Sequence, residues 1–187
     1  MTRTAALLCA AVLALTGCSA SSQPSRDSAA PVVPPSKVTE DHNDADLAYV
    51  DRMLSQHQQV VDLVAMVPNK DVPPELARLA RRLGDARTEE MGALRKMAEA
   101  WGVPKHAPDY HANPGELTIE QLVRIYELEG ADFSERWTQQ VIDNQRGAVA
   151  LSRAELDNGL NLGAREFARG LVRLLESQTA KLEALQG

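Results

Sequence analysis

Cysteine is scarce in this chain. Its 187 residues include two cysteines, Cys9 and Cys18, and both lie near the N-terminus. The sequence beyond Cys18 therefore holds no cysteine nucleophile, no zinc–thiolate site and no disulfide framework. An excess of positive charge is also missing. The formal net charge of −6 at pH 7 argues against a nucleic-acid partner, because phosphate binding needs a basic face.

The common catalytic patterns are absent as well. No Glu-x-x-His motif is present, although a ferritin-like di-iron centre needs two of them. The sequence also lacks a Ser-His-Asp-like grouping, a phosphate-binding loop and a glycine-rich cradle. The charged residues Arg87, Glu89, Glu90 and Arg95 are expected to form a solvated helix face. We therefore expect a protein that is not an enzyme.

The N-terminal segment has the layout of a secretory signal. Arg3 precedes an apolar run at residues 5–15, and the sequence Leu15-Thr16-Gly17-Cys18 closes it. A permanent membrane span would need ~20 apolar residues. The segment resembles a bacterial lipoprotein signal peptide, which implies cleavage after residue 17 and a diacylglyceryl group with further acylation, such as palmitate, on Cys18. The protein would then be anchored to the extracytoplasmic face of the cell membrane. The alternative is an ordinary secretory signal with an incidental cysteine.

The rest of the chain divides by composition. Residues 18–43 comprise the lipidated cysteine and a Ser- and Pro-rich tether that lacks core-forming residues. Residues 44–187 are rich in the helix formers Leu, Ala, Arg, Glu and Gln, and no sustained apolar–polar alternation predicts a strand. Long helices are expected at 44–67, 73–100, 132–158 and 162–185, and a short one at 118–129.

These helices predict an all-α fold, namely an antiparallel four-helix bundle. A short loop joins the first long helix to the second, and another joins the third to the fourth, and short loops make the helices they join antiparallel neighbours. Capping boxes are expected at Thr118 with Gln121 and at Asp132 with Glu135. In the first helix, mostly apolar residues recur at intervals of three and four positions, which predicts that they form its buried face, or seam. Its expected members are Leu47, Val50, Leu54, His57, Val61 and Val64.

The two halves of the domain also resemble each other. Residues 49–61 align with residues 137–149 at a shift of 88, which matches His57 with Gln145. The helices that follow keep the same shift. The bundle is therefore expected to consist of two repeated helical hairpins with pseudo-two-fold symmetry.

Three segments resemble a known family. Residues 53–67 and 137–159 are similar to two helices of the domain of unknown function 305 family that carry His-His pairs, and residues 79–102 are similar to the helix between them. The resemblance covers about residues 44–187. It implies a ferritin-like four-helix bundle that is often secreted or lipid-anchored. It also implies, for some members, binding of copper or other metals through the His pairs and methionines.

The chain departs from this family where the metal ligands would lie. Gln56-His57 stands in place of the first His pair, and Asn144-Gln145 stands in place of the second. One interpretation is that Gln56, Asn144 and Gln145 form a polar network in the core and hold no ion.

The other interpretation is a residual metal site. His57 lies one helical turn after Met53, and Met91 could join from the next helix. An imidazole and thioethers suit Cu(I). A lone histidine with nearby methionines is also an ordinary core arrangement.

Two functions follow as alternatives. The first is a membrane-anchored, non-catalytic module that binds another envelope protein or a small ligand. The second is an extracytoplasmic copper-binding protein that uses the residual His57 site. In both cases the lipid bilayer is a partner through the N-terminal anchor, and the sequence leaves the ligand and the oligomeric state open.

Overall fold

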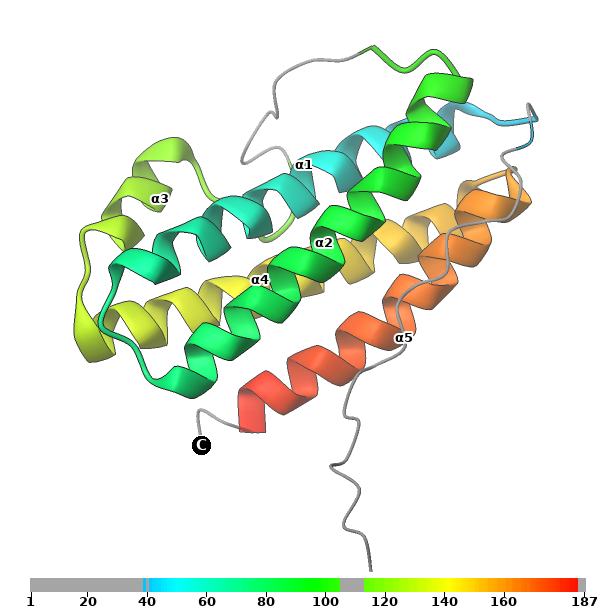
Figure 1. Ribbon diagram of the computed structural model, residues 1–187. Helices are drawn as coiled ribbons and strands as arrows, with labels where there is room; N and C mark the ends of the chain where they lie inside the picture. The colour runs from blue at the N-terminus through cyan, green and yellow to red at the C-terminus, as the bar shows by residue number, and fades with distance from the viewer. Residues whose placement is uncertain (1–38, 40, 105–112, 185–187) are drawn as a thin grey trace, which may run out of the picture.

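A computed structural model describes residue 39, residues 41–104 and residues 113–184. The predicted signal peptide at 1–17, the lipidation site Cys18 and most of the predicted tether lie outside these residues. The described parts are helical and contain no strand, which confirms the predicted all-α class (Figure 1). The helices are α1 (Asp44–Met66), α2 (Pro74–Ala100), α3 (Ile119–Tyr126), α4 (Gly130–Asn158) and α5 (Leu162–Ala184), and a 3-10 turn, η1 (Val67–Asn69), follows α1.

Side-chain caps fix where two of the helices begin. The Asn43 side chain accepts hydrogen bonds from the first-turn backbone of α1, and Asp46 accepts one from the Asn43 backbone in return. This reciprocal pair is a capping box. The predicted box of Thr118 and Gln121 is present at the start of α3.

The start of α4 differs from the prediction. A capping box at Asp132 and Glu135 is wrong, because α4 already begins at Gly130 after the extended residue Glu129. Asp132 lies in the first turn of the helix instead. A carboxylate there still favours the helix through the partial positive charge of its N-terminus.

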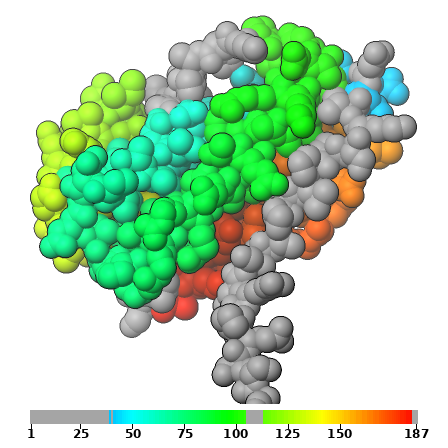
Figure 2. Space-filling model, in the orientation of Figure 1, coloured from blue at the N-terminus to red at the C-terminus, as the bar shows by residue number. Residues whose placement is uncertain are grey.

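The four long helices form a bundle (Figure 1). Helix α1 packs against α2 and against α4, and α4 also packs against α5. Helices α2 and α5 do not form an interface of similar extent, although both lie on the same face of the molecule (Figure 2). The short helix α3 packs against α4.

The apolar core consists of two clusters. One cluster lies around the N-terminal part of α1 and the C-terminal part of α2 and includes Val50, Met53, Leu94, Phe167 and Leu171. The other lies around the α1–α2 turn and includes Val60, Leu63, Leu83, Trp137 and Leu182. Both clusters draw residues from all four long helices.

The buried seam of α1 is shifted from its predicted position. Val60 and Leu63 are buried, whereas the predicted Val61 and Val64 are only partly buried. The reason is that α1 packs against α2 and α4 at once, so its apolar face is wider than a single coiled-coil seam.

A pair of buried carboxyl groups joins the ends of three helices. Asp46 of α1 is 0% exposed and accepts hydrogen bonds from the backbone nitrogens of Leu160 and Asn161, at 3.1 and 2.9 Å. Glu155 of α4 is 2% exposed, and no N–H among the described residues donates to either of its oxygens. Gly159 permits this arrangement, since a Cβ there would lie 2.2 Å from Glu155 Oε1.

Glu155 holds its proton because of this environment. Burial is the largest cause, and the hydrogen bond to Asp46 and its negative charge add to it, so that the pKa of Glu155 is raised to about 8. The neighbouring Arg165 opposes the rise. Burial also acts against ionisation of Asp46, but hydrogen bonds from Glu155 and from three backbone N–H groups lower the pKa of Asp46 overall.

This pair predicts a pH dependence of stability. A carboxyl group with a raised pKa in the folded state stabilises the fold fully below its unfolded pKa, near 4.5, and loses that contribution as the pH rises to about 8. Glu155→Gln keeps a donor for Asp46 without a titrating group. We expect urea unfolding to show the wild type losing up to about 1.4 kcal/mol per pH unit relative to this variant.

The exposed Glu99→Gln variant is the matched control, and it should keep the pH profile of the wild type. Equal slopes for the wild type and Glu155→Gln between pH 5 and pH 8 would contradict the raised pKa of Glu155.

Candidate functional site

A buried ion pair lies at the centre of the bundle, between the two apolar clusters. Arg87 and Glu90 occupy successive turns of α2 and are 1% and 3% exposed. The Nη1 group of Arg87 donates a hydrogen bond to Glu90 Oε2. Nε2 of His57, on α1, lies 3.0 Å from the same oxygen, although its ring N–H is not well aligned for a hydrogen bond. Glu90 thus links α1 to α2.

The charges of this cluster are fixed by its neighbours. Burial would raise the pKa of Glu90, but the Arg87 guanidinium and contact with His57 outweigh it and lower that pKa to about 2. Burial lowers the pKa of His57, and the charge of Arg87 lowers it further, against the opposing effect of Glu90. At neutral pH the cluster therefore holds an ionised Glu90, a charged Arg87 and a neutral imidazole.

Polar side chains of α4 and α5 continue the cluster. Gln145 Nε2 donates to Gln178 Oε1 at 3.2 Å, and Thr179 Oγ1 donates to Gln145 Oε1 at 2.9 Å. Arg87 Nη2 also donates to Gln178 Oε1, at 3.3 Å. Arg87 therefore connects the two halves of the bundle through hydrogen bonds.

This arrangement follows the internal repeat. His57 and Gln145 are equivalent at the shift of 88, and so are Glu90 and Gln178. The His57–Glu90 contact in one half thus corresponds to the Gln145–Gln178 hydrogen bond in the other. The same core position carries a neutral imidazole beside a carboxylate in the first hairpin and a pair of amides in the second.

The two halves meet at another equivalent pair. Gln56 Nε2 donates to the backbone oxygen of Asn144 at 2.8 Å, and Asn144 Nδ2 donates to the backbone oxygen of Gln56 at 3.3 Å. A second bond from Gln56 Nε2, at 3.2 Å, reaches the backbone oxygen of Pro114. These reciprocal bonds fix the register between α1 and α4.

The structure brings together some of the predicted site residues. Gln56 and Asn144 bond to each other's backbone, but Gln145 bonds to α5 instead, and neither Asn144 nor Gln145 has a hydrogen bond to His57 among the described residues. Met53 is buried in the first apolar cluster.

The predicted metal ligands lie in the core. His57, Met53 and Met91 are all buried. In the part of the chain that the structure describes, no group of three or more His, Cys, Asp or Glu is arranged to hold a metal ion. The prediction that His57, Met53 and Met91 bind copper remains a prediction.

Sequence reasoning missed the partner of His57. Arg87 and Glu90 were expected on a solvated face, which is wrong because both are buried, whereas Glu89 and Arg95 are exposed. The available signal was their register. Leu83, Arg87, Glu90 and Leu94 are spaced by four, three and four residues, which places both charges on the apolar face of α2.

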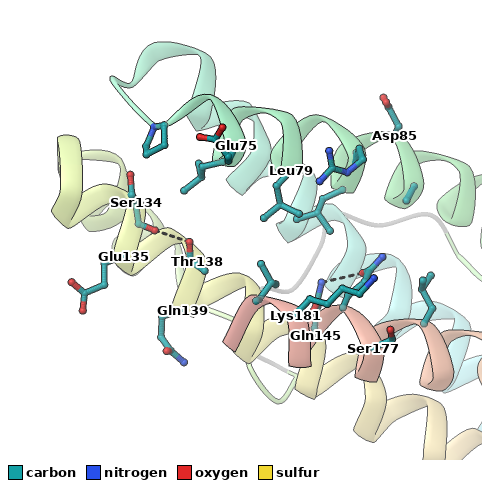
Figure 3. Close-up of a pocket in the computed structure, with 18 of the residues that line it drawn as sticks. Glu75, Leu79, Asp85, Ser134, Glu135, Thr138, Gln139, Gln145, Ser177 and Lys181 are labelled. Atoms are coloured by element: carbon teal, nitrogen blue, oxygen red, sulfur yellow. Dashed lines mark hydrogen bonds between the residues drawn. The ribbon is translucent and has the colours of Figure 1, made fainter. Parts of the chain in front are cut away.

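A groove opens beside the cluster, between α2 and α5 (Figure 3). Its volume is about 1280 Å³. Leucines of both helices form its walls, and Glu90, Gln145 and Gln178 line it at the level of the polar cluster. In Figure 3, Leu79 from α2 and Lys181 and Ser177 from α5 lie around Gln145, while Ser134 and Thr138 extend the groove along α4.

The fold and the site define an α-helical bundle of two related hairpins with a polar layer across its core. The chain belongs to the family described as "Domain of unknown function (DUF305)", whose model matches residues 46–187. The comparison with curated proteins gave no significant match.

Solved structures share this fold. A DUF305 protein of Streptomyces coelicolor, predicted to be secreted, is 22% identical with a TM-score of 0.69, and the match covers 75% of this chain and 91% of that one. A DUF305 fragment from Deinococcus radiodurans is 21% identical with a TM-score of 0.68, over 76% and 95% of the two chains. CopM in its Cu(I)-bound form is 16% identical with a TM-score of 0.63, over 75% and 94%.

None of the described helices is both long and apolar enough to cross a bilayer.

The ion pair makes a testable prediction about stability. Glu90→Gln leaves the buried Arg87 charge without its counter-charge, and we expect it to lower the free energy of unfolding by about 3–5 kcal/mol. The triple variant His57→Gln/Arg87→Leu/Glu90→Gln installs the residues found at the equivalent positions of the second hairpin, where Leu175 corresponds to Arg87. We expect the triple variant to lose less than half as much free energy of unfolding as Glu90→Gln.

Urea unfolding of both variants and the wild type measures the difference. A Glu90→Gln variant as stable as the wild type, or a triple variant less stable than Glu90→Gln, would contradict the claim that the buried charges of Arg87 and Glu90 each offset the cost of burying the other.

Proposed function

We propose that this protein is an extracytoplasmic module, held at the cell membrane by lipid on Cys18, that binds a ligand in the α2–α5 groove without catalysing a reaction. The observation that carries this proposal is the groove itself. It combines leucine walls with a polar layer formed by Glu90, Gln145 and Gln178. Apolar walls with a few oriented polar groups are the usual composition of a binding site.

The electrostatics of the cluster favour binding over catalysis. A general base works best with a pKa near the operating pH, whereas Arg87 and His57 hold the pKa of Glu90 at about 2. The carboxylate charge is compensated by Arg87 inside the protein. Glu90 therefore acts as a structural anion at the groove, and His57 serves as its neutral neighbour.

Two observations support the location. The sequence Leu15-Thr16-Gly17-Cys18 follows a short apolar run, and a structural neighbour from Streptomyces coelicolor is predicted to be secreted. The lipid on Cys18 would keep the domain at the membrane surface.

Lipid attachment is tested by metabolic labelling with alkyne-palmitate in a bacterial host. We expect the wild-type protein to carry the label and to fractionate with membranes, and we expect Cys18→Ala to lose both properties. Cys9→Ala is the matched control, because it also removes a cysteine but lies within the predicted signal peptide. Label that persists in Cys18→Ala would exclude this anchor.

Ligand entry into the groove is tested with Nile red, a neutral apolar dye, on the mature chain carrying Cys18→Ser. Dye bound in the groove should show blue-shifted emission, and Ala86→Trp, which fills the groove at a lining position, should abolish it. Ala65→Trp on the exposed side of α1 should leave it unchanged. Emission that responds equally to both tryptophans would rule out the groove as the site.

Copper binding is the second candidate function. CopM, in Cu(I)- and Cu(II)-bound forms, shares the fold. Met91 occupies the position equivalent to Thr179, whose hydroxyl contacts Gln145, so the repeat predicts that the Met91 thioether lies beside His57. The fit is incomplete, because His57 Nε2 already faces Glu90.

A Cu(I) titration under reducing conditions, with a competing chelator, tests this candidate. The copper-binding hypothesis predicts one-to-one binding of Cu(I), and it predicts that His57→Ala and Met91→Leu each weaken this binding by about tenfold or more. Met97→Leu, which changes another methionine of the core, is the control and should retain the binding. Binding no tighter than in His57→Ala would exclude this site.

A further inference from the structure

We propose that the α2–α5 groove accepts a positively charged amphipathic helix of another envelope protein. This inference rests on the proposed function and names the class of partner that the groove would bind. It is carried by the length of the groove, its apolar walls and the charge around it.

The shape of the groove suits an extended partner. Its lining runs from Pro73, which directly precedes α2, to Glu90 of α2, and this stretch corresponds to about 25 Å at ~1.5 Å per residue. The volume of about 1280 Å³ exceeds the range of roughly 300–1,000 Å³ that is typical of small-molecule sites. An α-helix of four to five turns has the length to occupy it.

The walls match the apolar face of such a helix. Leu76, Leu79 and Leu83 recur along α2 at intervals of three and four. Leu76 and Leu79 are partly exposed to the groove, whereas Leu83 and the α5 residues Leu174 and Leu182 line it from the buried core. Helices α2 and α5 do not pack against each other as closely as the other neighbouring helices do. The helix of the partner protein would therefore lie between α2 and α5. Binding of an amphipathic helix in an apolar groove is an established mode of peptide recognition, in which apolar side chains at positions i, i+3, i+4 and i+7 of the helix contact the groove.

The charged residues around the groove determine which charge is favoured on the partner helix. Apart from Glu90 and Glu75, which form ion pairs with Arg87 and Arg78, four carboxylates and three basic groups line the groove. The carboxylates are Asp85, Glu89, Asp132 and Glu135, and the basic groups are Arg82, Arg136 and Lys181. An excess of carboxylates on both α2 and α4 favours lysine or arginine on the polar flanks of the bound helix and disfavours acidic helices.

The experiment uses the mature chain carrying Cys18→Ser and two labelled model peptides of about 17 residues. One is built from leucine and lysine in a helical pattern, and the other has glutamate in place of lysine. Fluorescence anisotropy measures binding. We expect the leucine–lysine peptide to bind and the leucine–glutamate peptide to bind at least about tenfold more weakly.

A pair of charge-reversal variants locates the site. Glu75→Lys/Asp85→Lys/Glu89→Lys changes three exposed residues that line the groove, and Glu99→Lys/Glu127→Lys/Asp157→Lys changes three exposed residues outside its lining. Both triples alter net charge equally. We expect the groove triple to weaken binding by about tenfold and the control triple by less than about threefold.

Equal weakening by the two triples, or equal binding of the two peptides, would overturn the inference. The Nile red assay separates its failure from that of the proposed function. Dye binding that Ala86→Trp blocks, together with no selective peptide binding, would retain the groove as a site and reject a cationic helix as its occupant. Failure of both assays would reject both.

Discussion

The buried Arg87–Glu90 ion pair is the interaction on which the rest of the structure depends. A charge in a protein interior is costly unless it is compensated, so the two side chains can be buried only together. Glu90 also contacts His57 of α1, and Arg87 reaches Gln178 of α5. One pair of charges thereby ties both hairpins to a polar layer that separates the two apolar clusters, and the groove between α2 and α5 opens at this layer.

The internal repeat explains how such a layer fits into a simple bundle. The second hairpin carries Gln145 and Gln178 where the first carries His57 and Glu90. Both versions place polar side chains across equivalent helix pairs, with a hydrogen bond between two amides in the second hairpin and a carboxylate close to an imidazole in the first. The same backbone architecture therefore accepts different chemistry at equivalent positions, and Glu90, Gln145 and Gln178 contribute to the groove lining.

The sequence was sufficient to predict the helical class, most helix limits and the family, because periodicity, caps and loop lengths act locally. It was insufficient for the site. Arg87 and Glu90 are three residues apart and resemble an ordinary surface pair, and only their register with Leu83 and Leu94 indicates burial. The partner of His57 lies on another helix, and the groove depends on how far α2 and α5 approach each other, which no local pattern specifies.

The central claim is that Glu90 is a buried carboxylate, ionised at neutral pH beside a neutral His57, at the wall of the α2–α5 groove. A site-resolved NMR titration of the Glu90 carboxyl carbon and the His57 imidazole measures this directly. The account predicts a Glu90 pKa of about 2 and a His57 pKa below its ordinary value of 6.5. Titration of Glu90 near 4.5 together with His57 near 6.5 would show both groups in solvent-like surroundings and would contradict the account.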